Sequence, residues 1–176
     1  MCSIVMKFLP LSCLSLLLLS PAMAYAASPV PLGQFGKWSA YALDEENDKA
    51  CYMVSTPLKA EGAYTKRGTV YAIITHRPAE NTRDEFSFMA GYPYKEGSVV
   101  KMTIDGMAYN LKGGSNEAAF SADATTDQKI AAAVLKGSKL VVEGASARGT
   151  RTKDTFSLSG TGDAYKAIST ACNVIK

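Results

Sequence analysis

The sequence predicts a mainly β protein, an antiparallel β-sandwich or flattened barrel with two short helices. Short stretches in which polar and apolar residues alternate recur along the chain, separated by Gly, Pro, Asn and Asp. An Asp-Gly pair lies between two of these stretches and predicts a tight hairpin. Only two segments have the apolar spacing of an amphipathic helix. We therefore expect eight or nine short strands and two short helices.

Residues 1–26 are predicted to be a secretory signal peptide. Lys7 is their one charge, residues 14–19 are almost all leucine, and small residues up to Ala26 give the A-x-A cleavage pattern. The apolar run is short for a membrane span, and an uncleaved anchor is the alternative. Residues 27–176 are expected to form a single β-rich domain with no transmembrane span after signal cleavage. We expect export through the inner membrane and a periplasmic, surface-associated or secreted protein.

The first half of the predicted domain contains four strands. Alternation predicts strands at residues 39–43 and 51–55, joined by the acidic residues 44–48. These acidic residues are interpreted as a solvated hairpin loop, because the calcium-loop alternative needs EF-hand spacing and a glycine that they lack. Residues 59–68 are polar and predict a surface loop. Residues 69–75 are apolar on both faces, which is typical of a central strand, and 85–90 place Phe86 and Phe88 on one face.

The hairpin at residues 98–111 is the most specific local signal. Asp105-Gly106 is a type I′ turn sequence, because both turn positions need positive φ. Counting outward from the turn pairs Ile104 with Met107. The next pairs on the same face are Met102 with Tyr109 and Val100 with Leu111. This register places all six apolar side chains on one face of the hairpin.

Two helices and two strands complete the chain. Thr125 is predicted to cap a helix that Gly137 ends, with Gln128 completing a capping box and Ile130, Ala133 and Val134 facing inward. Strands follow from residue 140 and at 150–158, where Phe156 and Leu158 share a face with Thr152 and Asp154. Asp163 is predicted to cap the last helix, which places Ala164, Ile168, Ala171 and Cys172 on one face.

Cys51 and Cys172 remain after the signal peptide is removed. In an exported chain they most simply form one disulfide, and a pair of free thiols is the alternative. The chain has no C-x-x-C motif, which gives redox catalysis little support.

His76 is the only histidine and, with a nearby carboxylate, the candidate acid or base of an enzyme. A Ser–His–Asp set would use it, but the chain has no G-x-S-x-G motif. A zinc site usually needs three or four His, Cys or carboxylate ligands, and a single histidine does not favour one. The chain also has no phosphate-loop or dinucleotide motif. We expect no metal and no cofactor, and we keep a periplasmic hydrolase or isomerase using His76 as the alternative function. The formal net charge of +3 is too small to predict nucleic-acid binding.

Arg148, Arg151 and Lys153 are the candidate partner-binding residues, with Trp38 second. Arg151 and Lys153 share a strand face, where they would meet an acidic protein, a glycan or a lipid headgroup. A solvated face with pairing to neighbouring carboxylates is the simpler interpretation of these cations. For Trp38, packing in the core or at a sheet edge is the simpler interpretation.

Five short segments follow one another along nearly the whole predicted domain. They are Phe35-Gly36-Lys37-Trp38, Cys51-Tyr52-Met53-Val54, Thr75-His76-Arg77-Pro78, the Asp105-Gly106 hairpin, and residues 149–158 followed by Cys172. Together and in this order they resemble the invasion-associated locus B family of exported bacterial proteins. Family members often carry another cysteine shortly after the tryptophan, and its absence from residues 39–41 argues against a second disulfide. The resemblance implies an exported β-rich envelope protein linked to host-cell invasion, with no established enzyme activity and no catalytic residues to transfer.

Overall fold

The computed structural model describes residues 28–45, 48–95, 97–114 and 116–174. The predicted signal peptide, residues 1–26, lies outside these residues. The strands are β1 (Val30–Phe35), β2 (Trp38–Glu45), β3 (Asp48–Ser55), β4 (Lys59–Gly62), β5 (Tyr71–Arg77), β6 (Thr82–Met89), β7 (Val99–Ile104), β8 (Met107–Gly113), β9 (Ala118–Phe120), β10 (Lys139–Ala145) and β11 (Arg151–Ser157). The helices are α1 (Ala124–Lys136) and α2 (Thr161–Ala171), and a single 3₁₀ turn, Pro78–Glu80, follows β5.

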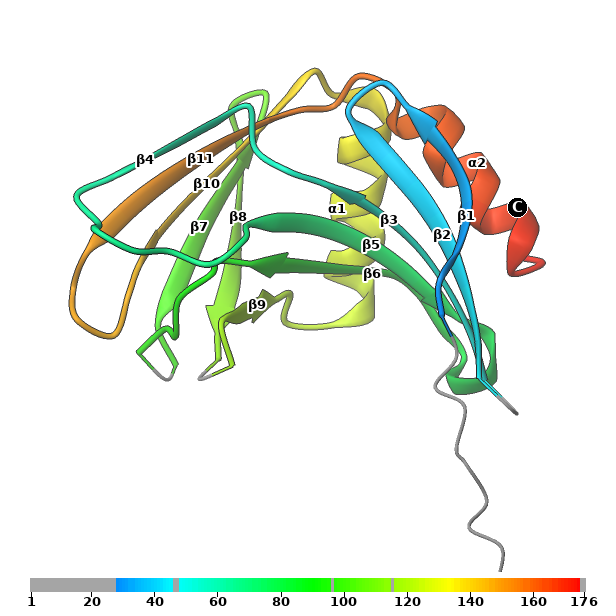
Figure 1. Cartoon of the computed structure of the whole chain (residues 1–176), viewed down its shortest axis with the longest axis horizontal. Coiled ribbons are helices and arrows are strands. Elements are labelled where there is room, and N and C mark those ends of the chain that lie inside the picture. The colour runs from blue at the N-terminus through cyan, green and yellow to red at the C-terminus, as the bar shows by residue number, and fades with distance from the viewer. Residues whose placement is uncertain (1–27, 46–47, 96, 115, 175–176) are drawn as a thin grey trace, which may run out of the picture.

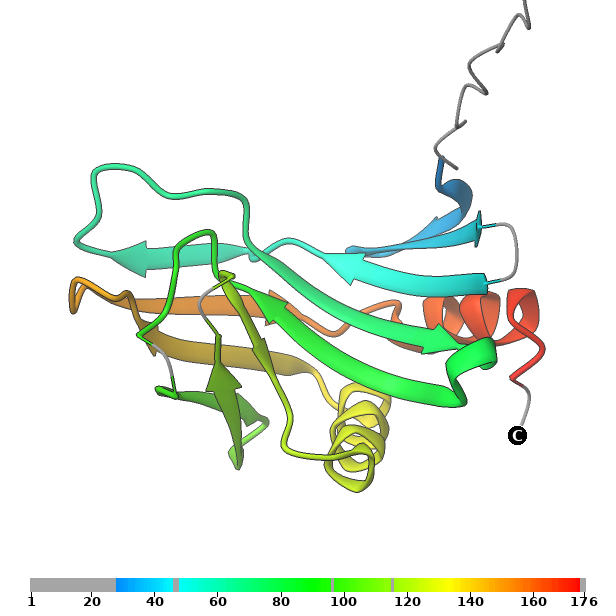
Figure 2. The same cartoon turned by 90° about the horizontal axis from the view of Figure 1, so that it is seen from below.

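The eleven strands form one antiparallel sheet in the order β1-β2-β3-β5-β6-β9-β8-β7-β10-β11-β4. This confirms a mainly β fold with two short helices. The sheet is open, because β1 and β4 are its two edges. Figures 1 and 2 show that it is strongly bent, so that β10, β11 and β4 face the half that contains β2, β3, β5 and β6.

The core fills the inside of this bend. Phe88 of β6 and Phe156 of β11 meet edge to face across it, with ring centroids 6.1 Å apart. The indole N–H of Trp38 in β2 donates to the carbonyl oxygen of Ser157 in β11 over 3.0 Å, which also joins the two halves. Leu158 is buried as predicted. Burial of such large apolar side chains is the main force that holds the sheet in its bent form.

The β7–β8 hairpin has the predicted register. Ile104 lies opposite Met107, Met102 opposite Tyr109, and Val100 opposite Leu111. Asp105 and Gly106 both have positive φ, as a type I′ turn requires. Among the apolar residues of this hairpin, Met107 is largely exposed, at 63%, because it lies next to the turn.

The segment Lys59–Gly68, predicted to be a surface loop, begins with strand β4. Lys59–Gly62 pairs antiparallel with residues of β11, and Thr152 lies opposite Gly62. The four residues of β4 show no apolar alternation, because they are an edge strand with mostly exposed side chains. Strands β1 and β9 were also not predicted as strands.

Both predicted helices are present, but both predicted N-caps are wrong. Asp123 caps α1, and its carboxylate accepts a hydrogen bond from the Thr126 N–H over 2.8 Å. Thr125 is inside the helix, because Asp123 already supplies the capping oxygen. Gly160 caps α2, and Asp163 lies in the first turn of that helix. Ile130, Val134, Ala164 and Ile168 are buried as expected.

The helices cover different parts of the sheet and also contact each other. Helix α1 packs on β6, and α2 packs on β1, β2 and β3. Among the described residues, neither helix has the length and hydropathy that a membrane crossing requires.

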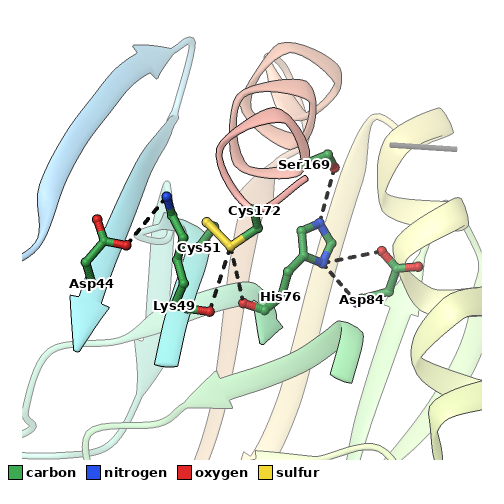
Figure 3. Close-up of a disulfide and its surroundings, with 7 residues drawn as sticks. All are labelled: Asp44, Lys49, Cys51, His76, Asp84, Ser169 and Cys172. Carbon is green, nitrogen blue, oxygen red and sulfur yellow. Dashed lines mark hydrogen bonds and ion pairs between the residues drawn. A yellow bond between two sulfur atoms is a disulfide. The ribbon is translucent and has the colours of Figure 1, made fainter. Parts of the chain in front are cut away.

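Cys51 and Cys172 form the predicted disulfide, with their Cα atoms 5.9 Å apart. It joins β3 to the end of α2 across a sequence separation of 121 residues (Figure 3). The disulfide therefore fixes the last helix to the sheet. Such a bond is typical of proteins outside the cytoplasm.

We predict that Gly160→Ala destabilises the protein more than Gly149→Ala. Both glycines have positive φ, 92° and 85°, so each alanine carries a left-handed strain of about 1–2 kcal/mol. A Cβ at Gly160 would also lie 2.0 Å from the carbonyl oxygen of Phe35, whereas a Cβ at Gly149 would meet no atom within 4 Å. Urea unfolding measures the two losses, and equal losses would contradict the close approach at Gly160.

We predict that removing the disulfide with Cys51→Ala and Cys172→Ala lowers the free energy of unfolding by roughly 2–5 kcal/mol. The loss arises because the unfolded chain gains freedom when a loop of 121 residues is released. Urea unfolding with and without a reducing agent provides the control. The reductant should destabilise the natural chain to the level of the double variant and leave the variant unchanged.

Candidate functional site

His76 lies fully buried in β5, opposite Cys51 in the register of β3 and β5. Its Nδ1 accepts a hydrogen bond from the backbone N–H of Asp84 over 3.1 Å. Its Nε2 lies 3.2 Å from Ser169 Oγ on α2 (Figure 3). Because a backbone N–H only donates, Nδ1 is unprotonated, so Nε2 carries the proton of the neutral ring and donates to Ser169.

Ser169, His76 and Asp84 thus resemble a Ser–His–Asp set in composition but not in hydrogen bonding. In a catalytic triad the carboxylate accepts from Nδ1–H, which leaves Nε2 free to take the serine proton. Here the Asp84 Oδ1 lies 3.9 Å from Nδ1 and accepts from the Tyr165 hydroxyl over 2.5 Å. His76 lines none of the three surface pockets that the following paragraphs describe. The geometry gives His76 a role in packing and hydrogen bonding and lends no support to the enzyme alternative.

A distortion of the sheet brings these groups together. The pairing of β5 with β6 shifts between Thr75 and Arg77, and Asp84 has a φ of 62°. The Asp84 side chain consequently turns into the core, while the neighbouring Glu85 pairs with Arg77 at the surface. Adjacent residues of a strand point to opposite faces, as Asp84 and Glu85 do, but nothing in the sequence shows that Asp84 meets His76.

Burial controls the protonation of this cluster. It lowers the pKa of His76, and the charge of Asp84 opposes the shift only in part. Burial and then the Asp84 carboxylate raise the pKa of Tyr165 to about 12, so its hydroxyl stays a donor. The Tyr165 ring also packs edge-on against the imidazole, with centroids 5.3 Å apart.

Lys153 lies in a row of alternating charges on the outer face of the sheet. In the registers of four neighbouring strands, Glu61, Lys153, Glu143 and Lys101 follow one another. The Lys153 Nζ lies 3.7 Å from Glu143 Oε1, and both side chains are about half exposed. An exposed pair of this kind contributes little to stability, at most about 1 kcal/mol. Lys153 therefore has the neighbouring carboxylate partner that the simpler interpretation expects.

Arg151 is exposed two residues from Lys153 on the same face of β11. It makes no ion pair with any residue that the structure describes. It lines a shallow groove of about 480 Å³ with Lys153, Glu61, Glu143 and Val99, and Val99 is 66% exposed. We call this surface the outer groove. It combines an unneutralised guanidinium with an exposed apolar side chain.

Arg148 does not belong to the outer groove. It lies in the turn between β10 and β11 and lines a different cavity of about 600 Å³, formed by residues 63–68, 91–93 and 146–148 with Glu117, Thr150 and Thr152. We call this the turn cavity. Two of the segments that form the turn cavity are joined by a hydrogen bond of 2.8 Å from the Gly68 N–H to the Gly91 carbonyl oxygen. The sequence groups Arg148 with Arg151 and Lys153, whereas the fold separates them.

Trp38 has no exposed surface and bonds to Ser157, so its indole is not accessible to a partner in this structure. The candidate partner-binding role of Trp38 has no geometric support here. A third pocket, of about 570 Å³, lies between β1 and α2 and is lined by Leu32 and Phe35. None of the sequence-predicted site residues lines it.

The sequence pattern of the invasion associated locus B (IalB) proteins matches residues 38–169. The chain belongs to this family. Among solved structures, the invasion associated protein B of Bartonella henselae is similar to it, with a TM-score of 0.54 over 82% of this chain and 99% of that one. The two sequences are 13% identical, so the likeness supports the fold alone. No curated protein sequence matches the chain significantly.

Family membership confirms the resemblance noted in the sequence. The family match includes Cys51 and His76, while Cys172 lies just beyond its end. The IalB match thus covers every strand of the sheet other than β1, together with most of α2.

We predict that His76 makes the protein less stable as the pH falls from 7 to 5. The unfolded histidine binds a proton near pH 6.5, whereas the buried one has a lower pKa. The unfolded state therefore binds more protons in this range, and stability falls with pH by up to about 1.4 kcal/mol per unit from this group. Urea unfolding at several pH values should show a steeper slope near pH 6 for the natural chain than for His76→Gln. Equal slopes would contradict this.

Proposed function

We propose that this IalB protein is an exported, non-enzymatic binding or accessory module of the cell envelope, linked to host-cell invasion or to envelope integrity. The observation that carries the proposal is Arg151, an exposed guanidinium without an ionic partner among the described residues, beside exposed Val99 in the outer groove. The family and the disulfide support a place outside the cytoplasm, either in the periplasm or at the cell surface.

The chemistry of the outer groove favours an acidic partner. A guanidinium presents several donors in a plane and suits carboxylate, sulfate or phosphate oxygens. Lys153 adds a second cation that a stronger anion would draw from Glu143, because their 3.7 Å contact is exposed and weak. The partner is an envelope or host protein, a glycan or a lipid headgroup that presents acidic groups beside an apolar edge.

We predict that Arg151→Glu with Lys153→Glu removes the partner captured by in-cell crosslinking of the natural protein. Reversing two charges turns attraction to an acidic surface into repulsion. Mass spectrometry of the crosslinked material measures the loss, which should be at least about tenfold, as 1.4 kcal/mol would give. Thermal unfolding verifies that the variant is folded.

The matched control is Lys112→Glu with Lys129→Glu, which makes the same change of net charge at exposed residues outside the outer groove. This control should retain the partner. If the groove variant kept every partner that the natural chain captures, the placement of the binding surface would be wrong. If the control lost them equally, net charge alone would explain the capture.

A further inference from the structure

The turn cavity has a rigid aromatic wall. The guanidinium of Arg67 lies between the rings of Tyr64 and Tyr92, 5.3 and 5.0 Å from their centroids. It donates two hydrogen bonds of 2.7 Å to the carboxylate of Asp154 and one of 2.6 Å to the carbonyl oxygen of Ala90. The three hydrogen bonds hold the guanidinium in one orientation, so the two tyrosines that pack on it are positioned before any ligand arrives.

The charge of Arg67 is already neutralised inside the protein. Its side chain and that of Asp154 are 4% and 1% exposed. Burial alone would lower the pKa of Arg67, but the hydrogen bonds and charge of Asp154 outweigh it and raise that pKa. Arg67 therefore serves as a support for the wall. The positive charge that a ligand meets comes from other residues.

Lys66 and Arg148 supply that charge at the rim. Both line the cavity, both are exposed, and neither has an ion pair among the residues that the structure describes. Glu117 is the one acidic side chain of the lining. The rim thus has an excess of positive charge, which favours an anionic ligand.

Hydroxyl groups complete the lining. Thr65, Ser146 and Thr150 line the cavity with the two tyrosines, and the Tyr92 hydroxyl shares a hydrogen bond of 2.7 Å with Thr152. Hydroxyls both donate and accept, which matches the groups of a sugar ring. Tyrosine rings add an apolar surface with a polar tip. A volume of about 600 Å³ is in the range of small-molecule sites.

We propose that the turn cavity binds an anionic sugar, a mono- or disaccharide that carries a sulfate, phosphate or carboxylate group. The sugar ring packs against Tyr64 and Tyr92, the hydroxyl-bearing residues bond to its oxygens, and Lys66 and Arg148 bind the anionic group. This site shares only Thr152 with the outer groove, and neither Arg151 nor Lys153 lines it. The two proposals therefore fail independently.

Isothermal titration calorimetry of the mature protein tests the proposal with four probes. A sulfated heparin disaccharide, glucosamine 1-phosphate and glucuronic acid represent the three kinds of anionic sugar, and inorganic sulfate represents the anion alone. We expect saturable binding of at least one sugar, about tenfold or more tighter than inorganic sulfate. Which sugar binds distinguishes a glycan source from a phosphorylated lipid headgroup. Binding of no sugar, or equal binding of sulfate alone, overturns the proposal.

Variants place the binding in the cavity. Arg148→Glu should weaken sugar binding about tenfold or more, since it removes a charge-assisted hydrogen bond and places a like charge beside the anionic group. Tyr64→Ala should weaken it about fivefold, and Tyr64→Phe should retain it, because the ring does the packing. Lys112→Glu is the matched control and should bind like the natural chain. Equal weakening by Lys112→Glu would show a nonspecific charge effect and overturn the assignment to this cavity.

Discussion

The buried pair of Arg67 and Asp154 fixes how the segments that apolar burial brings together in the bent sheet lie against one another. Asp154 comes from β11, Arg67 from the segment after β4, and the Ala90 carbonyl that Arg67 also binds follows β6. One guanidinium thus joins three segments that are distant in the sequence. An ion pair in the interior costs desolvation and stabilises a fold only when its remaining donors and acceptors are satisfied. Here each nitrogen of the guanidinium donates one hydrogen bond. Removing one partner of such a pair costs about 3–5 kcal/mol, because the other charge stays buried.

Strand β6 has a buried polar cluster near each of its ends. Asp84 lies near its beginning and holds His76 and Tyr165, while Ala90 lies just beyond its end and holds Arg67. The Asp84 cluster and the disulfide attach α2 to the sheet. The Arg67 cluster shapes the turn cavity. The polar groups of the interior therefore divide into one set that secures the fold and one that lies beneath a surface where a ligand can bind.

The sequence predicts those parts of the structure that depend on local patterns. The 98–111 hairpin is correct to the residue, because Asp105-Gly106 fixes the turn and alternation fixes the faces. Arg151 and Lys153 are correctly placed on one exposed face by the same alternation. The strand β4 is missed because its pairing with β11 is decided by tertiary structure, and its own residues have no strand pattern.

The candidate sites were less predictable, because loops that are distant in sequence build them. The turn cavity joins three such segments, and no local pattern places Arg148 beside Tyr64. One signal was present: Asp154 shares an inward face with Phe156, and a carboxylate in the core requires a cationic partner. That reasoning predicts a buried Arg or Lys but does not identify Arg67. The β5–β6 distortion that brings Asp84 to His76 likewise has no signal in the sequence.

The position of β11 has a consequence for the order in which the chain can fold. Strand β11 lies between β10 and β4, and it supplies Asp154 to Arg67. A chain that emerges from a ribosome or a translocation channel from its N-terminus exposes β4 and Arg67 long before β11 follows. During that interval β4 has no neighbouring strand and Arg67 has no carboxylate, and pairings so distant in sequence form slowly. The residues of β4 are mostly exposed, and two of them, Lys59 and Glu61, are charged. These charges disfavour pairing of the exposed β4 edge with strands of other molecules until β11 is present.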